Sequence, residues 1–125
     1  MNQQKTLLAG AILGGLGVAL GAFGAHALKD VLTASGRLDT FELAVRYEFY
    51  HAFALLTVGI LHQWMNPKYL KTSALFFLSG TVLFSGSLYL LCFTNNAAFA
   101  MATPFGGVLL ILGWIFLTIS ILYKK

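Results

Sequence analysis

Long apolar runs separated by short polar segments dominate this chain. Charged side chains are absent from three stretches, residues 6–28, 49–67 and 72–123. A membrane-spanning helix needs about 20 mostly apolar residues. The first two stretches therefore each accommodate one such helix, and the third, which is interrupted at Asn95-Asn96, accommodates two. The pattern predicts four spanning helices, over approximately residues 6–28, 43–64, 72–93 and 103–123.

The composition supports this class. Of the 125 residues, 58% are hydrophobic and only 10% are charged, against about 25% charged in a soluble domain. A secreted disulfide scaffold, a nucleic-acid-binding domain and a water-soluble enzyme are thereby excluded. The formal net charge of +4 comes from dispersed basic residues at segment ends, where they suit anionic lipid headgroups. We expect a single transmembrane domain, residues 1–125, that contacts the lipid bilayer and binds no nucleic acid.

Glycines mark the faces along which these helices are expected to pack. On the first helix they alternate at intervals of four and three residues: Gly10, Gly14, Gly17, Gly21 and Gly24. Small residues let helix backbones approach closely in lipid, where no hydrophobic force draws helices together. We therefore expect the first helix to be central in an all-α, four-helix bundle. The third and fourth helices carry further packing glycines: Gly80, Gly86, Gly106 and Gly113.

The distribution of charge predicts an orientation. Five lysines would be cytoplasmic if the N-terminus is inside, namely Lys5, Lys68, Lys71, Lys124 and Lys125. Three basic residues would be outside: Lys29, Arg37 and Arg46. All four acids share that outer segment: Asp30, Asp39, Glu42 and Glu48. Because basic residues accumulate on the cytoplasmic side, we expect both termini in the cytoplasm and a multi-pass protein of the bacterial inner membrane.

Polar residues near the outer membrane boundary are the candidates for chemistry. Tyr47, Glu48 and His51 lie within one turn of the second helix, and His26 is near the outer end of the first. Polar groups at membrane depth are costly unless they are paired, so each marks a candidate site. The sequence predicts one cluster of His26, Tyr47, Glu48 and His51 at the outer ends of these two helices.

Four roles for this cluster are open at the level of sequence. It is a hydrogen-bonded clasp between helices, a proton-handling or substrate-contact site, a metal site, or a haem site with two histidine ligands. One E-x-x-H pair is present, Glu48 and His51, but no H-x-x-x-H pair accompanies it to fix a metal geometry. No nucleophile elbow, P-loop or dinucleotide fingerprint is present. We therefore predict no catalytic residue, no metal and no cofactor.

Four segments carry a resemblance to a known family. They are residues 21–28 (GAFGAHAL), 44–52 (AVRYEFYHA), 84–89 (FSGSLY) and 103–107 (TPFGG). Together they resemble the YwdK/YgdD-like family of small multi-pass inner-membrane proteins of unknown function, which has small eukaryotic transmembrane relatives. The resemblance implies a four-helix integral membrane protein and no particular reaction. This chain has Glu48 where the family favours a neutral amide after the tyrosine.

The sequence thus favours a non-enzymatic membrane protein. We expect an accessory subunit of a larger membrane complex or a self-associating bundle, because the chain is small and rich in glycines at the spacing that lets helices pack closely. The alternatives are an oligomeric transporter of a small molecule or of protons that uses the polar cluster, and a metal- or haem-binding membrane protein.

Overall fold

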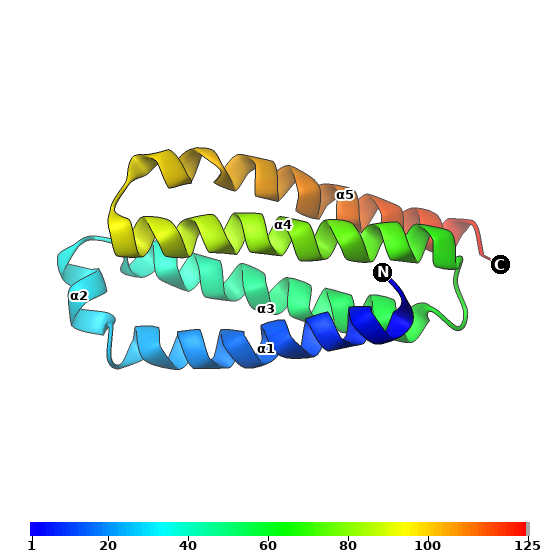
Figure 1. The fold of residues 1–125 in the computed structure, drawn as a ribbon, viewed down its shortest axis with the longest axis horizontal. Helices are drawn as coiled ribbons and strands as arrows, with labels where there is room; N and C mark the ends of the chain where they lie inside the picture. The colour runs from blue at the N-terminus through cyan, green and yellow to red at the C-terminus, as the bar shows by residue number, and fades with distance from the viewer. Residues whose placement is uncertain (125) are drawn as a thin grey trace.

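Four long helices, placed side by side, form the body of the protein in a computed structural model that describes residues 1–124 (Figure 1). The elements are α1 (Gln3–Ala25), α2 (Lys29–Ala34), α3 (Leu38–Leu61), α4 (Pro67–Thr94), the 3-10 helix η1 (Ala97–Met101) and α5 (Thr103–Leu122). The N-terminus and the α3–α4 turn lie at one end of the molecule, and α2 and the α4–α5 connection lie at the other. The described residues contain no strand.

Asparagines set several of the helix boundaries. The side chain of Asn2 accepts from the backbone N–H of Lys5 at the start of α1, and that of Asn66 caps α4, whose first residue is Pro67. Asn95 ends α4 in the left-handed conformation, with φ of 55°, which asparagine tolerates better than most residues. The interruption predicted at residues 95–96 is confirmed.

Three helical segments are long and apolar enough to cross a membrane: Gln3–Ala25, Pro67–Thr94 and Ala97–Leu122. They correspond to the first, third and fourth predicted spans. The second predicted span falls largely within α3, which has 24 residues and a length of about 36 Å at about 1.5 Å per residue. Arg46, Glu48 and His51 lower the hydropathy of α3, so its place in the membrane stays a prediction.

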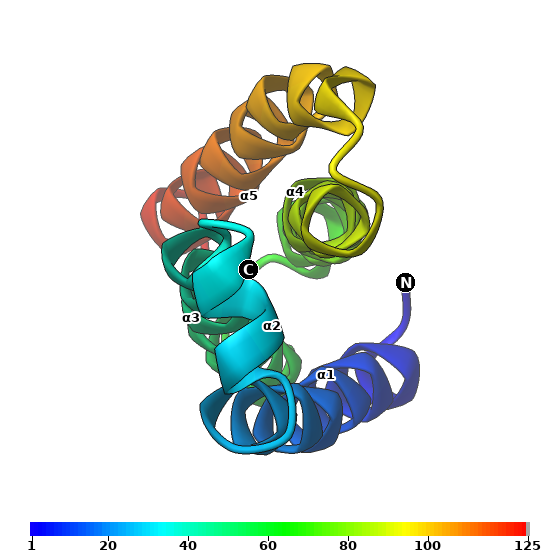
Figure 2. The same cartoon turned by 90° about the vertical axis from the view of Figure 1, so that its left-hand side faces the viewer.

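The first helix lies at the edge, and the expectation that it is central is wrong for this single chain. α1 packs against α3, α3 against α4, and α4 against α5; Figure 2 shows α1 on the far side of α3 from α5. The buried residues of α1 are Thr6, Gly10, Gly17 and Gly24. Every second glycine of the alternating series is buried against α3, so the glycines form one narrow contact with one neighbour.

Two apolar clusters fill the interior. The larger joins α3, α4 and α5 through residues such as Leu55, Phe77 and Leu110. The smaller lies beneath α2, where Leu32 packs with Phe41 and Cys92. The polar segment between the first two predicted spans contains α2, and the single buried residue of α2, Leu32, packs it onto the end of the bundle.

Candidate functional site

Glu48 is the buried carboxylate of α3, with 4% of its surface exposed. One of its oxygens, Oε1, accepts a hydrogen bond of 2.9 Å from the hydroxyl of Tyr89 on α4. The other oxygen, Oε2, is buried without a hydrogen-bond partner among the described residues. It faces α1, because a Cβ atom built on Gly17 would lie 3.3 Å from it. Glu48 thus stands where α1, α3 and α4 meet.

His51 is also 4% exposed but faces a different neighbour. Its Nδ1 lies 2.8 Å from the carbonyl oxygen of Tyr47, one turn earlier in α3. The indole N–H of Trp114 on α5 lies 3.1 Å from its Nε2. A carbonyl only accepts and an indole N–H only donates, so Nδ1 carries the proton and Nε2 accepts. Both nitrogens are occupied, and the ring joins α3 to α5.

Tyr47 contributes to this region of α3 through both its ring and its backbone carbonyl. Its ring stacks on Phe84 of α4 with 4.6 Å between centroids, and its carbonyl holds His51. Tyr47 is half-buried. Tyr47, Glu48 and His51 therefore lie together on α3, but their side chains point to different neighbours: Tyr47 to α4, Glu48 to α4 and α1, and His51 to α5.

The structure does not bring His26 to these three residues. His26 is the exposed C-cap of α1, and its backbone N–H bonds to the carbonyl of Ala22. The nearby Gly24 contacts Phe41, two turns before Glu48 on α3. The imidazoles of His26 and His51 do not face one another, since the ring of His51 packs against Phe77 and Trp114. Within residues 1–124, no three His, Cys, Asp or Glu side chains gather to form a metal site.

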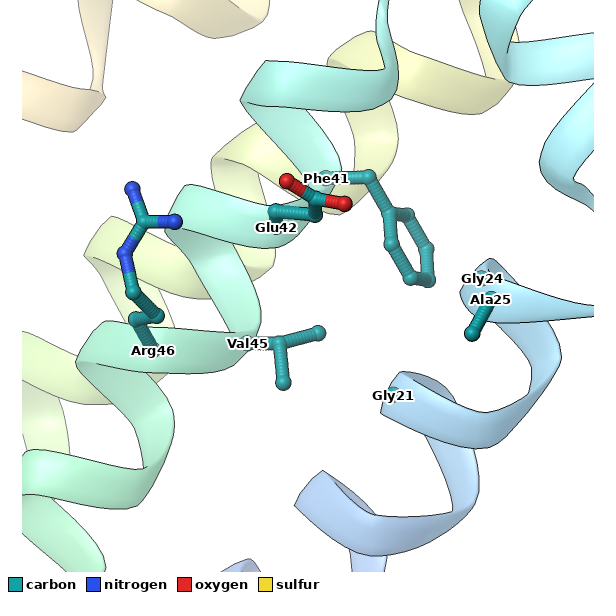
Figure 3. Close-up of a pocket in the computed structure, with 7 residues that line it drawn as sticks. All are labelled: Gly21, Gly24, Ala25, Phe41, Glu42, Val45 and Arg46. Carbon is teal, nitrogen blue, oxygen red and sulfur yellow. The ribbon is translucent and has the colours of Figure 1, made fainter.

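A groove of about 290 Å³ opens between the halves of α1 and α3 that lie nearest to α2. Figure 3 shows its lining, which is Gly21, Gly24, Ala25, Phe41, Glu42, Val45 and Arg46. The ring of Phe41 extends toward Gly24, and Val45 points into the space between the two helices, whereas Arg46 turns away from α1. The groove is mainly apolar, with one acid and one base on its α3 rim.

The predicted packing glycines differ in how closely they approach a neighbouring helix. A Cβ would meet a neighbouring helix at less than 3.1 Å at Gly10, Gly17, Gly24, Gly80, Gly106 and Gly113. Gly21 makes an ordinary contact with Val45 at 3.4 Å, while Gly14 and Gly86 have no such neighbour within 4 Å. The sequence did not point to Gly59, which packs on Leu7. Gly59 lies on the buried face of α3, but as a single glycine it belongs to no repeat that would mark it as a packing residue.

Sequence reasoning also missed the polar partners on the other helices. The sequence places Tyr89 in the segment 84–89 without linking it to Glu48, and nothing in the sequence links Trp114 to a histidine. Two serines join helices as well: Ser85 donates to the carbonyl of Ala44 and Ser73 to that of Gly113, each over 2.7 Å. Each of these side chains is a hydrogen-bond donor within an apolar helix, which by itself indicates that it has a partner. Which partner it has depends on how the helices pack.

Comparison with known proteins places the chain in a family. The model of the family described as "Protein of unknown function (DUF423)" matches residues 20–107. The chain belongs to DUF423. This DUF423 chain is 40% identical to UPF0382 membrane protein SSP2132 of Staphylococcus saprophyticus, over 91% of this chain and 93% of that protein.

A second relative comes from a different bacterium. UPF0382 inner membrane protein YgdD of Escherichia coli is 34% identical, over 100% of this DUF423 chain and 95% of that protein. No solved structure matches the chain. The resemblance inferred from the four motifs is confirmed, and the chain is a membrane protein with transmembrane helices.

Proposed function

We propose that this DUF423 protein is a non-enzymatic membrane protein that acts by associating through α1, with a second copy of itself or with a partner subunit. In this proposal α3 is the fourth span of a four-helix bundle, and both termini are in the cytoplasm of a bacterium. The bilayer and the associated chain are its partners. The exposed face of α1 carries the proposal.

That face is apolar and lacks a neighbour within the chain. Leu8, Ile12 and Leu16 are each at least half exposed, and Gly14 and Gly15 have open space where a side chain would be. Lipid solvates such a face, but Gly15, which shares it with Leu8 and Ile12, and Gly14 at its flank also allow another helix to approach the backbone closely. The opposite face of α1 already uses glycines in this way against α3, which supports the same use on the free face.

The two ends of the molecule support the orientation. Lys5, Lys68 and Lys71 lie near the end that holds the N-terminus and the α3–α4 turn, whereas Asp30 and Asp39 lie at the α2 end. Excess lysine marks the cytoplasmic side. A membrane-impermeant thiol reagent should label Ala98→Cys in intact cells and Gln63→Cys only after the membrane is opened, both in a Cys92→Ser background. The reverse pattern contradicts the orientation.

Association is tested by chemical cross-linking in membranes, followed by native mass spectrometry of the tagged chain in mild detergent. We expect either a homo-oligomer or one stoichiometric partner. Gly14→Leu and Gly15→Leu should abolish the larger species. Gly86→Leu is the matched control, because Gly86 on α4 also has open space around it, and it should leave association intact. A chain that is monomeric and without a partner contradicts the proposal.

A second candidate function is transport of protons or a small molecule by an oligomer. The unpartnered Oε2 of the buried Glu48 favours it, because ionisable groups within the membrane mark ion pathways in many transporters. Proteoliposomes that contain the native chain should then take up protons or the small molecule. This flux should be lost with Glu48→Gln and retained with Glu42→Gln, which changes an exposed acid of the same helix. Equal flux in the native chain and Glu48→Gln removes this candidate.

A further inference from the structure

The junction of α1, α3 and α4 contains a polar atom that the surrounding fold leaves unused. Oε2 of Glu48 is buried and has no hydrogen-bond partner among the described residues, although Oε1 is held by Tyr89. Buried carboxylate oxygens are normally satisfied by donors or by a countercharge. The single donor on the other oxygen is a neutral hydroxyl, which leaves the negative charge of an ionised Glu48 without a compensating cation.

The groups that face Glu48 can be named for each packed helix. On α1 the neighbour is Gly17, which has no side chain. On α4 it is Tyr89; the thiol of Cys92, one turn further, points instead to the carbonyl of Arg37. On α3 itself, Tyr47 stacks on Phe84 and His51 bonds to Trp114, so neither turns toward Oε2. None of these groups supplies a positive charge beside Oε2, and they do not form the ring of oxygen ligands that a metal cation requires.

We propose that Oε2 of Glu48 is a binding position for a single proton, and that this proton keeps α1 closed against α3. The proton is taken from water and returned to water, and the O–H bond is the only bond that forms or breaks. In the neutral acid the carboxyl group can be buried between helices. The ionised carboxylate requires hydration, and Oε2 faces Gly17 of α1, so separation of α1 from α3 would let water reach it.

The packing of α1 makes such an opening possible. α1 has extensive contact with α3 and few contacts with any other helix, and its Ala9 and Leu13 touch only the edge of the α3–α4–α5 core, so movement of α1 would mainly separate it from α3. At the level of Glu48 the barrier is thin: Gly17 lies against the carboxyl oxygen and the ring of Phe49. A side chain at position 17 would fill the space beside Oε2, so the glycine both permits close packing and leaves the oxygen accessible when α1 moves.

This inference supports the transport candidate but does not require it. If Glu48 binds the proton and α1 opens but no net flux of protons or solute is measured, the transport candidate is removed, whereas the proton site at Glu48 remains. The inference is also independent of association, which concerns the opposite face of α1.

Infrared spectroscopy and distance measurement test the two halves of the proposal on the full chain in lipid nanodiscs. The carbonyl band of a neutral carboxylic acid should be present at neutral pH in the native chain and in Glu42→Gln, and absent in Glu48→Gln. Spin labels at Val18→Cys on α1 and Phe53→Cys on α3, in a Cys92→Ser background, report the separation of the two helices. Both positions are exposed.

Raising the pH should remove the band and lengthen the distance between the labels together. In Glu48→Gln, which retains the shape of the neutral acid, the short distance should persist at every pH. A band that is missing at neutral pH, or that survives in Glu48→Gln, overturns the proton site. A band that titrates while the distance stays constant overturns the coupling to α1.

Discussion

The indole N–H of Trp114 on α5 donates to Nε2 of His51 on α3 over 3.1 Å. It is a direct polar link between two helices that otherwise meet mainly through α4. Because Nδ1 of the same ring is held by the carbonyl of Tyr47, the histidine acts as a fixed bridge and has no free nitrogen for a ligand.

Removing the donor should weaken this bridge. Trp114→Phe keeps an aromatic ring but leaves Nε2 of His51 without a partner. We expect a loss of about 0.6–2 kcal/mol in the free energy of unfolding, measured by titration from lipid-like micelles into SDS. A double-mutant cycle with His51→Leu isolates the pair. Additive effects of the two substitutions would show that the hydrogen bond contributes nothing to stability.

The α4–α5 contact depends on the absence of a side chain at Gly106. A Cβ there would lie 2.5 Å from the backbone nitrogen of Phe84, and a backbone atom cannot rotate away. Gly106→Ala should therefore separate the helices and lower the unfolding free energy by about 1–3 kcal/mol.

The adjacent Gly107 is the matched control. A Cβ at Gly107 would be 3.9 Å from the ring of Phe84, an ordinary contact. Gly107→Ala should be neutral or stabilising by a few tenths to about 1 kcal/mol, because alanine favours a helix over glycine. Equal losses at both positions would contradict the close approach at Gly106.

Ser85 joins two helices through a buried hydroxyl. It donates to the carbonyl of Ala44 on α3, whereas Ser79 donates to the carbonyls of Leu75 and Phe76 within α4. We expect Ser85→Ala to cost about 0.6–1.7 kcal/mol in SDS unfolding and Ser79→Ala to cost almost nothing, since its carbonyls keep their helical bonds. A larger loss at Ser79 would rule out this assignment.

The backbone of Asn95 offers a test of the α4 terminus. Its φ of 55° is strained for residues with a branched Cβ and free for glycine. Asn95→Gly and Asn95→Val both remove the acceptor that holds Arg37, so they differ mainly in backbone cost. The valine variant should be less stable by about 1–2 kcal/mol. Identical stabilities would mean that the turn relaxes to another conformation.

The helix boundaries show where local reasoning works. Asn66 caps the start of α4 through its side chain, Pro67 is the first residue of that helix, and Asn95 ends it in the left-handed conformation. Neither α3, which begins at Leu38, nor α5, which begins at Thr103, has a side-chain cap, and the hydroxyl of Thr103 instead pairs with Ser87 of α4 at 2.6 Å. Tertiary contact competes for a polar side chain at a helix end.

The sequence by itself determined the membrane class, the family and the positions of the long helices, because these follow from hydropathy, charge and local backbone preference along the chain. It also selected Glu48 and His51, since a polar group in an apolar helix stands out without knowledge of its surroundings. Only the tertiary structure decided that α1 is an edge helix, that His26 lies apart, and that Tyr89 and Trp114 are the partners. Those relationships depend on which face of each helix meets which neighbour, and in lipid that choice is made by close packing between distant residues.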